Sequence, residues 1–198
     1  MAVIQLAVAP AGRIDPAEVE GALHLVARAL KSPVEFREAL PLPRGTEDVA
    51  RGQHKAASLL TSLRLAGGRA GKVADVGEDD SGVEGAGKNC LVLVTDVDMY
   101  TPDTEFVFSL TTAAGGAGLV SVKRMREAFY RRKSDPEKQK ARLAKEILRC
   151  AGQLVGLPDC GDPRCGNATT RNLQDIDTRK VRLCAPCWRW LSTGTMSI

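Results

Sequence analysis

Four cysteines near the C-terminal end of the chain constrain its fold more than any other feature of the sequence. They are Cys160, Cys165, Cys184 and Cys187, spaced as Cys-x4-Cys-x18-Cys-x2-Cys. Two close pairs of thiolates joined by a loop match the tetrahedral ligand set that zinc prefers, and four protein ligands leave no position open for water. The spacing therefore predicts one structural zinc ion, with two disulfides or free thiols as the alternatives.

The overall composition is that of an ordinary globular chain. Its 198 residues, 43% hydrophobic and 26% charged, suffice for one domain with a small appended module. No apolar run approaches the roughly 20 residues that span a membrane, and we expect a cytoplasmic protein. A net charge of +4 and an aromatic content of 4% give little support for binding to nucleic acid. With only two histidines, a site with three histidine ligands is excluded.

Hydrophobic periodicity predicts alternating strands and helices. Asp15 and Pro16 have the residue types of a helix N-cap and first helical position, and apolar residues recur at helical spacing up to Leu30. We expect strands over residues 3–9, 34–40, 90–95, 105–110 and 118–122, and helices over 15–30, 46–66 and 135–155. This alternation favours an α/β fold.

Three segments allow two interpretations each. The glycine-rich residues 67–88 lead into a P-loop-like sequence over 82–89, but that sequence ends in Asn and runs into a strand, so we interpret it as a flexible loop. Asp96 and Asp98 suit either a cation site or a turn between strands, and we favour the turn. Residues 123–149 carry eleven Lys or Arg against four acidic residues. Such a stretch can bind phosphates or form a solvated helix face, and its apolar seam favours the solvated face.

The segment from Arg149 to Cys187 resembles the archaemetzincins, zinc metalloproteases of the metzincin clan, whose motif HExxHxxGxxHC is followed by x4-C-x-M and a later CxxC. All four cysteines match this motif, and so does Gly156. Residues 51–53, 94–102, 106–108 and 119–122 are similar to other parts of the family pattern. The resemblance implies a metzincin-like mixed sheet with helices over residues 1–156. Residues 157–198 would form a small C-terminal zinc-binding subdomain, and the two parts one compact unit.

The residues at the family's catalytic positions differ from its motif. The three zinc-binding histidines correspond to Arg149, Gln153 and Asp159, and the catalytic glutamate corresponds to Cys150. The Met-turn methionine corresponds to Asn167. Arginine cannot bind a metal and glutamine is a weak zinc ligand. The resemblance thus implies a kept scaffold with a degenerate catalytic site, in which we expect Arg149 and Asp159 to bridge each other beside Gln153.

Three functional hypotheses follow from these residues. The first is a pseudoprotease with no catalytic residues and one structural zinc, which retains peptide binding along the strand expected at 105–110. The second is an active zinc hydrolase with a rebuilt site that uses Asp159, Cys150 or groups supplied by another segment, although we favour a buried helical thiol at Cys150. The third is a nucleic-acid-binding zinc module that uses the basic stretch.

Overall fold

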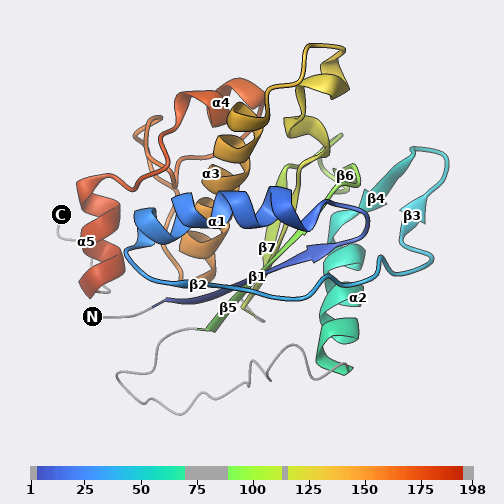
Figure 1. Cartoon of the computed structure of the whole chain (residues 1–198), viewed down its shortest axis with the longest axis horizontal. Coiled ribbons are helices and arrows are strands. Elements are labelled where there is room, and N and C mark those ends of the chain that lie inside the picture. The colour runs from blue at the N-terminus through green and yellow to red at the C-terminus, as the bar shows by residue number, and fades with distance from the viewer. Residues whose placement is uncertain (1–3, 70–88, 113–115, 194–198) are drawn as a thin grey trace.

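The structure is a computed structural model that describes residues 4–69, 89–112 and 116–193. Its elements are, in chain order, β1 Gln5–Ala11, α1 Pro16–Leu30, β2 Val34–Phe36, β3 Glu47–Asp48, β4 Gln53–Lys55, α2 Ala56–Arg69, β5 Asn89–Thr95, β6 Met99–Tyr100, β7 Ser109–Thr112, β8 Ala117–Ser121, the 3-10 turns η2 Lys123–Met125 and η3 Glu127–Tyr130, α3 Pro136–Leu154, α4 Leu173–Thr178 and α5 Ala185–Thr193. The predicted α/β fold is confirmed (Figure 1).

A five-stranded mixed sheet forms the centre of the fold. Its strand order is β2-β1-β5-β8-β7, with all neighbours parallel except the edge strand β7, which runs antiparallel to β8. A second sheet of three short strands, ordered β3-β4-β6, lies beside it. Central strands buried on both faces explain why β1 and β5 are almost continuously apolar in sequence.

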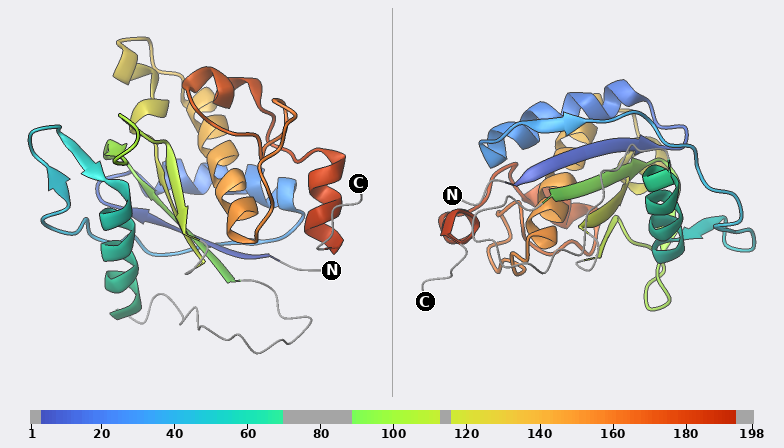
Figure 2. Two further views of the ribbon diagram at one scale, coloured as in Figure 1. Left: turned by 180° about the vertical axis from the view of Figure 1, so that it is seen from behind. Right: turned by 90° about the horizontal axis from the view of Figure 1, so that it is seen from below.

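The helices cover the two faces of the larger sheet. One hydrophobic cluster joins α1 and α3 to alternate residues of the strands, such as Val8, Val92 and Val120. The intervening residues, such as Ala9 and Leu93, belong to a second cluster with α2. Figures 1 and 2 show α2 well apart from α1 and α3. Ile176 and Leu191, from the C-terminal part of the chain, also belong to the first cluster. The expected division of the chain into residues 1–156 and 157–198 stays a prediction.

Local signals explain where the two long helices begin and end. The Asp15 side chain accepts a hydrogen bond from the Ala17 amide at 2.9 Å, as its N-cap residue type predicts. Asp135 caps α3 in the same way, accepting from the Lys138 amide at 3.0 Å. Gly156 follows α3 with a φ of 91°, a conformation that favours glycine, and it turns the chain back as predicted.

Two predicted elements have different bounds from those expected. Residues 46–55 were predicted as helix but contain the hairpin of β3 and β4, because Gly52 takes a φ of 64° and the Gln53 side chain binds Asp98 and the Glu105 carbonyl. The strand expected at 105–110 begins only at Ser109. Residues 67–69 end α2, and the remainder of the expected glycine-rich loop, with the P-loop-like sequence up to residue 88, lies outside the described residues.

The expectation of a solvated basic face on α3 is wrong for its middle turns, although the apolar seam is buried as expected. Arg142 has an exposed fraction of 1% and forms ion pairs with Asp177 at 2.6 Å and Glu127 at 2.8 Å. Lys145 donates to the Ile176 carbonyl at 3.0 Å. Glu146 pairs with Arg179, and both side chains are fully buried. These charges therefore hold α3 to neighbouring segments.

Among the described helices, none combines the length and the apolar composition needed to cross a lipid bilayer.

Breaking the buried pair of Glu146 and Arg179 is expected to be strongly destabilising. The Arg179→Met variant leaves the buried Glu146 carboxylate without its cation, and we expect its free energy of unfolding in urea to fall by about 3–5 kcal/mol. Replacing both partners, with Glu146→Leu added, should restore part of that loss because no unpaired charge remains. The exposed Arg189→Met serves as the control, with an effect within about 0.5 kcal/mol. Equal stability of the Arg179 and Arg189 variants would contradict this assignment.

Candidate metal centre and the adjoining helix

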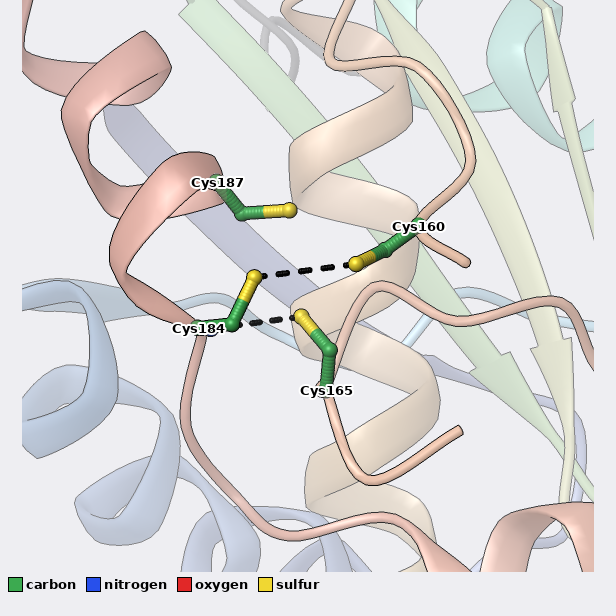
Figure 3. A group of neighbouring side chains, drawn as sticks. All are labelled: Cys160, Cys165, Cys184 and Cys187. Carbon is green, nitrogen blue, oxygen red and sulfur yellow. Dashed lines mark hydrogen bonds between the residues drawn. The ribbon is translucent and has the colours of Figure 1, made fainter. Parts of the chain in front are cut away.

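The four predicted cysteine ligands come together at the C-terminal end of the chain (Figure 3). Cys160 and Cys165 lie in the loop after α3, while Cys184 and Cys187 lie just before and within α5. All four sulfur atoms are within 4.8 Å of one another. In a tetrahedral site with Zn–S bonds of about 2.3 Å the sulfurs are separated by about 3.8 Å, so this spacing suits one zinc ion.

The surroundings of the cysteines suit thiolate ligands. The amides of Asp162 and Cys184 donate to the sulfurs of Cys160 and Cys165, at 3.4 Å and 3.3 Å. The amide of Asn167 also donates to Cys165, at 3.4 Å. Hydrogen bonds to a charged sulfur stabilise the deprotonated form that binds metal. None of the four cysteines forms a disulfide, and the 3.6 Å between the Cys160 and Cys184 sulfurs is far longer than a disulfide bond.

A tight contact with α3 fixes the loop that carries Cys165. Gly166 donates its amide to the Arg182 carbonyl at 2.8 Å, and a Cβ built on it would lie 2.6 Å from the Leu148 side chain. Only glycine therefore fits between the cysteine loop and the helix. The cluster itself packs against Leu157 and Trp190. The position of the metal centre thus depends on the last turns of α3.

Those last turns carry Arg149 and Gln153, and the loop after them carries Asp159, the three residues that correspond to histidines in the resemblance. Arg149 donates from Nη2 to Asp159 Oδ1 at 3.2 Å, and Gln153 donates from Nε2 to the same oxygen at 3.3 Å. The contact predicted between Arg149 and Asp159 is thus confirmed. The Arg149 side chain is 12% exposed and that of Asp159 50%. Thr111 on β7 donates to Gln153 Oε1 at 3.2 Å, and this hydrogen bond joins Arg149, Gln153 and Asp159 to the sheet edge.

Cys150 occupies the position of the catalytic base but points into the core. Its exposed fraction is 0%, and burial raises the pKa of the thiol to about 12. The adjacent Glu146 also raises this pKa, and Arg149 offsets only part of the effect. At neutral pH the thiol is protonated, so the interpretation of Cys150 as a buried helical thiol is favoured over that of a nucleophile.

Asn167, at the position of the Met-turn residue, is fully buried below α3. It donates from Nδ2 to the Pro158 carbonyl at 2.7 Å. A Cβ built on Gly152 would lie 2.8 Å from its side-chain oxygen, so the helix and Asn167 are in close contact. The residue therefore links the turn after α3 to the cysteine loop through a polar contact.

Sequence reasoning missed the buried carboxylate one turn before Arg149. Glu146 accepts hydrogen bonds from Ser109 at 2.9 Å and Thr170 at 2.7 Å, in addition to its ion pair with Arg179. These partners lie 24 to 37 residues away in sequence. The one available signal was an acidic residue facing the apolar side of the predicted helix.

Two other predicted features have local structural roles. Asp98 binds the Arg124 guanidinium through two bonds of 2.7 Å and also accepts from the Met99 amide, so it is neither a metal ligand nor only a turn residue. His54 contacts the Thr46 hydroxyl at 3.0 Å, and His24 lies exposed on α1. Within the described residues, the cysteine cluster is the one group of three or more ligand side chains that can hold a metal ion.

Known proteins similar to this chain are zinc peptidases and their relatives. A family model described as peptidase family M54 matches residues 47–193. An archaemetzincin of Thermococcus kodakarensis is 30% identical over 141 residues, which cover 71% of this chain and 67% of the relative. One from Saccharolobus islandicus is 32% identical over 97 residues, and the match spans 49% of this chain and 52% of that protein's length.

A solved structure is similar over almost the whole chain. It is the crystal structure of a zinc-dependent peptidase from Methanocorpusculum labreanum, with 26% sequence identity and a TM-score of 0.81. The superposition covers 94% of this chain and 99% of the other. The similarity therefore includes the sheet, the long helix and the cysteine-bearing segment together.

Metal analysis tests the cysteine centre directly. We expect the purified protein to contain one zinc ion per chain after dialysis against a mild chelator, because four thiolates surround the site. Cys184→Ala should remove the ion and unfold the C-terminal segment, since metal binding and folding are coupled there. Cys150→Ala, which removes a buried thiol outside the cluster, should keep it. Zinc retained in full by the Cys184 variant would refute the ligand assignment.

A double-mutant cycle tests the contact between Arg149 and Asp159. We expect Arg149→Ala and Asp159→Ala to be coupled by about 0.5 kcal/mol in the free energy of unfolding, a small value because half-exposed charges are screened by solvent. Arg149→Ala combined with Asp103→Ala, an exposed aspartate elsewhere, should be additive. Strict additivity in both cycles would show that the contact is absent in solution.

Proposed function

Given that this chain belongs to peptidase family M54, the archaemetzincins, we propose that it is a member that keeps a structural zinc site and has lost the catalytic one. Such a protein is a pseudoprotease. It keeps the helix, the sheet edge and the cysteine-bound metal of the scaffold, but it has no metal-activated water. The chain spans about half the length of some of the relatives that it matches.

The observation that carries the proposal is the guanidinium of Arg149 at the first ligand position. Arginine stays protonated in proteins and has no lone pair to give to a metal. Its positive charge also repels a cation at the same place. Asp159 and Gln153, the two remaining ligand positions, are bonded to this group or to each other. An ion pair thus holds helix to loop where the family motif would place zinc.

A rebuilt hydrolase has less support, because the candidate bases are unsuited to that role. Cys150 is buried with a pKa raised to about 12. Glu146 is fully buried, and its carboxylate oxygens are taken by Ser109, Thr170 and Arg179. A general base must reach the water from which it takes a proton. Asp159 is the one carboxylate at these positions that solvent reaches, and Arg149 and Gln153 bind it.

The cysteine centre supports a structural role for its metal. With four thiolates the coordination sphere is complete, and no site remains for water or substrate. The centre ties the loop after α3 to α5, next to a small apolar cluster that includes Leu157 and Trp190. We therefore propose that the zinc ion stabilises the folded form of this segment, as the spacing of the four cysteines in the sequence suggested.

Peptide binding along the sheet edge is part of the proposal. β7 is the edge strand, and its residues Ser109–Thr112 are only partly buried. An extended peptide can add to such an edge through main-chain hydrogen bonds. Through Thr111 the edge contacts Gln153, so a bound peptide would pass the altered ligand positions.

A nucleic-acid-binding role has weaker support, because many cations of the basic stretch are already paired. Arg124, Arg126 and Arg142 form ion pairs with acidic side chains. Paired guanidinium groups contribute less to the counterion release that drives binding to phosphates.

Peptide cleavage tests the proposal. The zinc-supplemented protein, incubated with a broad peptide library and analysed by mass spectrometry, should give no chelator-sensitive cleavage above the level of its Cys150→Ala variant. The physical reason is that no residue at the ligand positions can assemble a zinc-bound water. Saturable cleavage abolished by a chelator would refute the pseudoprotease assignment.

A variant that rebuilds the family motif provides the matched control. Arg149→His, Cys150→Glu, Gln153→His and Asp159→His together supply three imidazoles and a base on the same scaffold. We expect this variant to bind one zinc ion more than the unaltered protein. Equal zinc content in the two proteins would show that the scaffold no longer places these positions around one point.

A further inference from the structure

A hollow of about 460 Å³ lies at the carboxyl ends of the parallel strands, away from the cysteines and from Arg149. Its lining includes Gly12 after β1, Asp96 after β5, Lys123 after β8 and, from the hairpin of β3 and β4, Glu47 and His54. Cys150, by contrast, lies beside Gly118, near the start of β8. The hollow and the altered ligand positions thus lie at opposite ends of the same strand.

The hollow coincides with the point where the connections of the sheet diverge. The pairing of β1 and β5 ends at Ala11 and Thr95, so Gly12 and Asp96 are the next residues of two neighbouring strands. After β1 the chain leads through α1 to β2 at one edge, and after β5 it leads towards β7 at the other. In open α/β sheets such a divergence opens a crevice in which ligands bind.

A glycine keeps space open beside the carboxylate of Asp96. Gly12 has a φ of 87°, so the position favours glycine. A Cβ built on it would lie 3.6 Å from Asp96 Oδ1 and 3.3 Å from the Leu42 side chain. The hydroxyl of Thr95, the residue before Asp96, is fully buried and does not line the hollow. The Asp96 carboxylate is therefore the group that the hollow exposes at this point.

The carboxylates of Asp96 and Asp98, which both line the hollow, differ in whether they are bound by other residues of the protein. Asp98 is neutralised by Arg124 and also accepts from Gln53. The carboxylate of Asp96, in contrast, makes no hydrogen bond or ion pair within the described part of the chain. A half-buried carboxylate without a partner is a costly arrangement, and a cationic ligand group would relieve it. Glu47 also lines the hollow without an ion pair among the described residues, but it is exposed, so Asp96 is the half-buried anion that a ligand would shield.

Two cations lie on the rim. Arg13 and Lys123 are exposed, and neither forms an ion pair with another described residue. The lining charges without an ion pair among the described residues are therefore the carboxylates of Asp96 and Glu47 and the cations of Arg13 and Lys123. No Phe, Tyr or Trp is among the described lining residues, so a nucleotide base would find no ring to stack on.

We propose that this hollow binds a small zwitterion, an α-amino acid or a dipeptide. Its ammonium group donates to Asp96, and its carboxylate binds Arg13 and Lys123. The volume lies within the range of roughly 300–1,000 Å³ typical of small-molecule sites. The site is separate from the sheet edge and the metal centre, so it does not depend on the proposed loss of catalysis.

NMR titration of the full-length, zinc-loaded protein tests the proposal. The probes are the common L-amino acids and L-alanyl-L-alanine at millimolar concentration, with adenosine monophosphate for comparison. At least one zwitterion should shift the amide signals of Gly12 and Asp96. Shifts by none of them, shifts only near Arg149 and Gln153, or binding of the nucleotide alone would each overturn the proposal.

Variants and blocked ligands identify the two charged contacts. Asp96→Asn should weaken binding of the zwitterion by about tenfold to a hundredfold, the usual size of a charged hydrogen bond. Asp103→Asn, an exposed aspartate outside the hollow, should leave binding unchanged. The N-acetylated probe should bind as weakly to the parent protein as to the Asp96 variant.

The carboxylate contact has its own test, which does not require the Asp96 variant to fold. Arg13→Gln and Lys123→Gln should each weaken binding of the free-acid probe several-fold but leave binding of its C-terminal amide unchanged. Lys133→Gln, which removes an exposed cation elsewhere, is the control. Equal effects of Arg13→Gln on the acid and on the amide would overturn the proposed orientation.

Discussion

The buried ion pair between Glu146 and Arg179 is the contact on which the arrangement of the C-terminal third depends. Burial acts to raise the pKa of Glu146, but the charges of Arg179 and Arg149 and the hydrogen bonds from Thr170 and Arg179 together outweigh it, so the pKa lies below its usual value. Arg179 also donates to the carbonyls of Gly166 and Ala168, in the loop that follows Cys165. Glu146 in turn binds Ser109 on the edge strand. One buried charge pair therefore joins the long helix, the sheet edge and the cysteine loop.

This arrangement separates the metal centre from the altered ligand positions, although Asp159 and Cys160 are adjacent in sequence. The cysteines depend on the loop and on α5, whereas Arg149 and Gln153 project from α3. The cysteine ligands are held by backbone amides and the tight packing of Gly166. Arg149 and Gln153 take no part in these contacts, so the four cysteines can keep their arrangement when those two residues change, provided that Leu148 of α3 still packs against Gly166.

Features that depend on local chemistry could be predicted from the sequence, and features that depend on distant partners could not. The caps of α1 and α3, the turn at Gly156 and the cysteine spacing each follow from a few neighbouring residues. The contact of Arg149 with Asp159 was predictable because the family motif places both around one point.

The errors had a common physical cause in long-range polar contacts. Residues 46–55 have no strong strand pattern, and their hairpin is held by Gln53, whose partners Asp98 and Glu105 lie far away in sequence. The basic stretch suggested a solvated face, because nothing near Arg142 reveals its pairing with Asp177, 35 residues later. The hollow beside Gly12 is likewise formed by segments that only the sheet brings together.

On the proposal that the catalytic zinc site has been lost, the pairing of Arg149 with Asp159 makes that loss hard to reverse in evolution. Asp159→His alone would deprive Arg149, whose side chain is only 12% exposed, of its carboxylate. Arg149→His alone would leave Gln153 and Cys150 in place and would give no usable set of ligands. Each single step towards the ancestral motif thus lowers stability or gains nothing. A lineage in this state is separated from metal-dependent catalysis by a fitness valley, and its scaffold is free to be selected for other purposes.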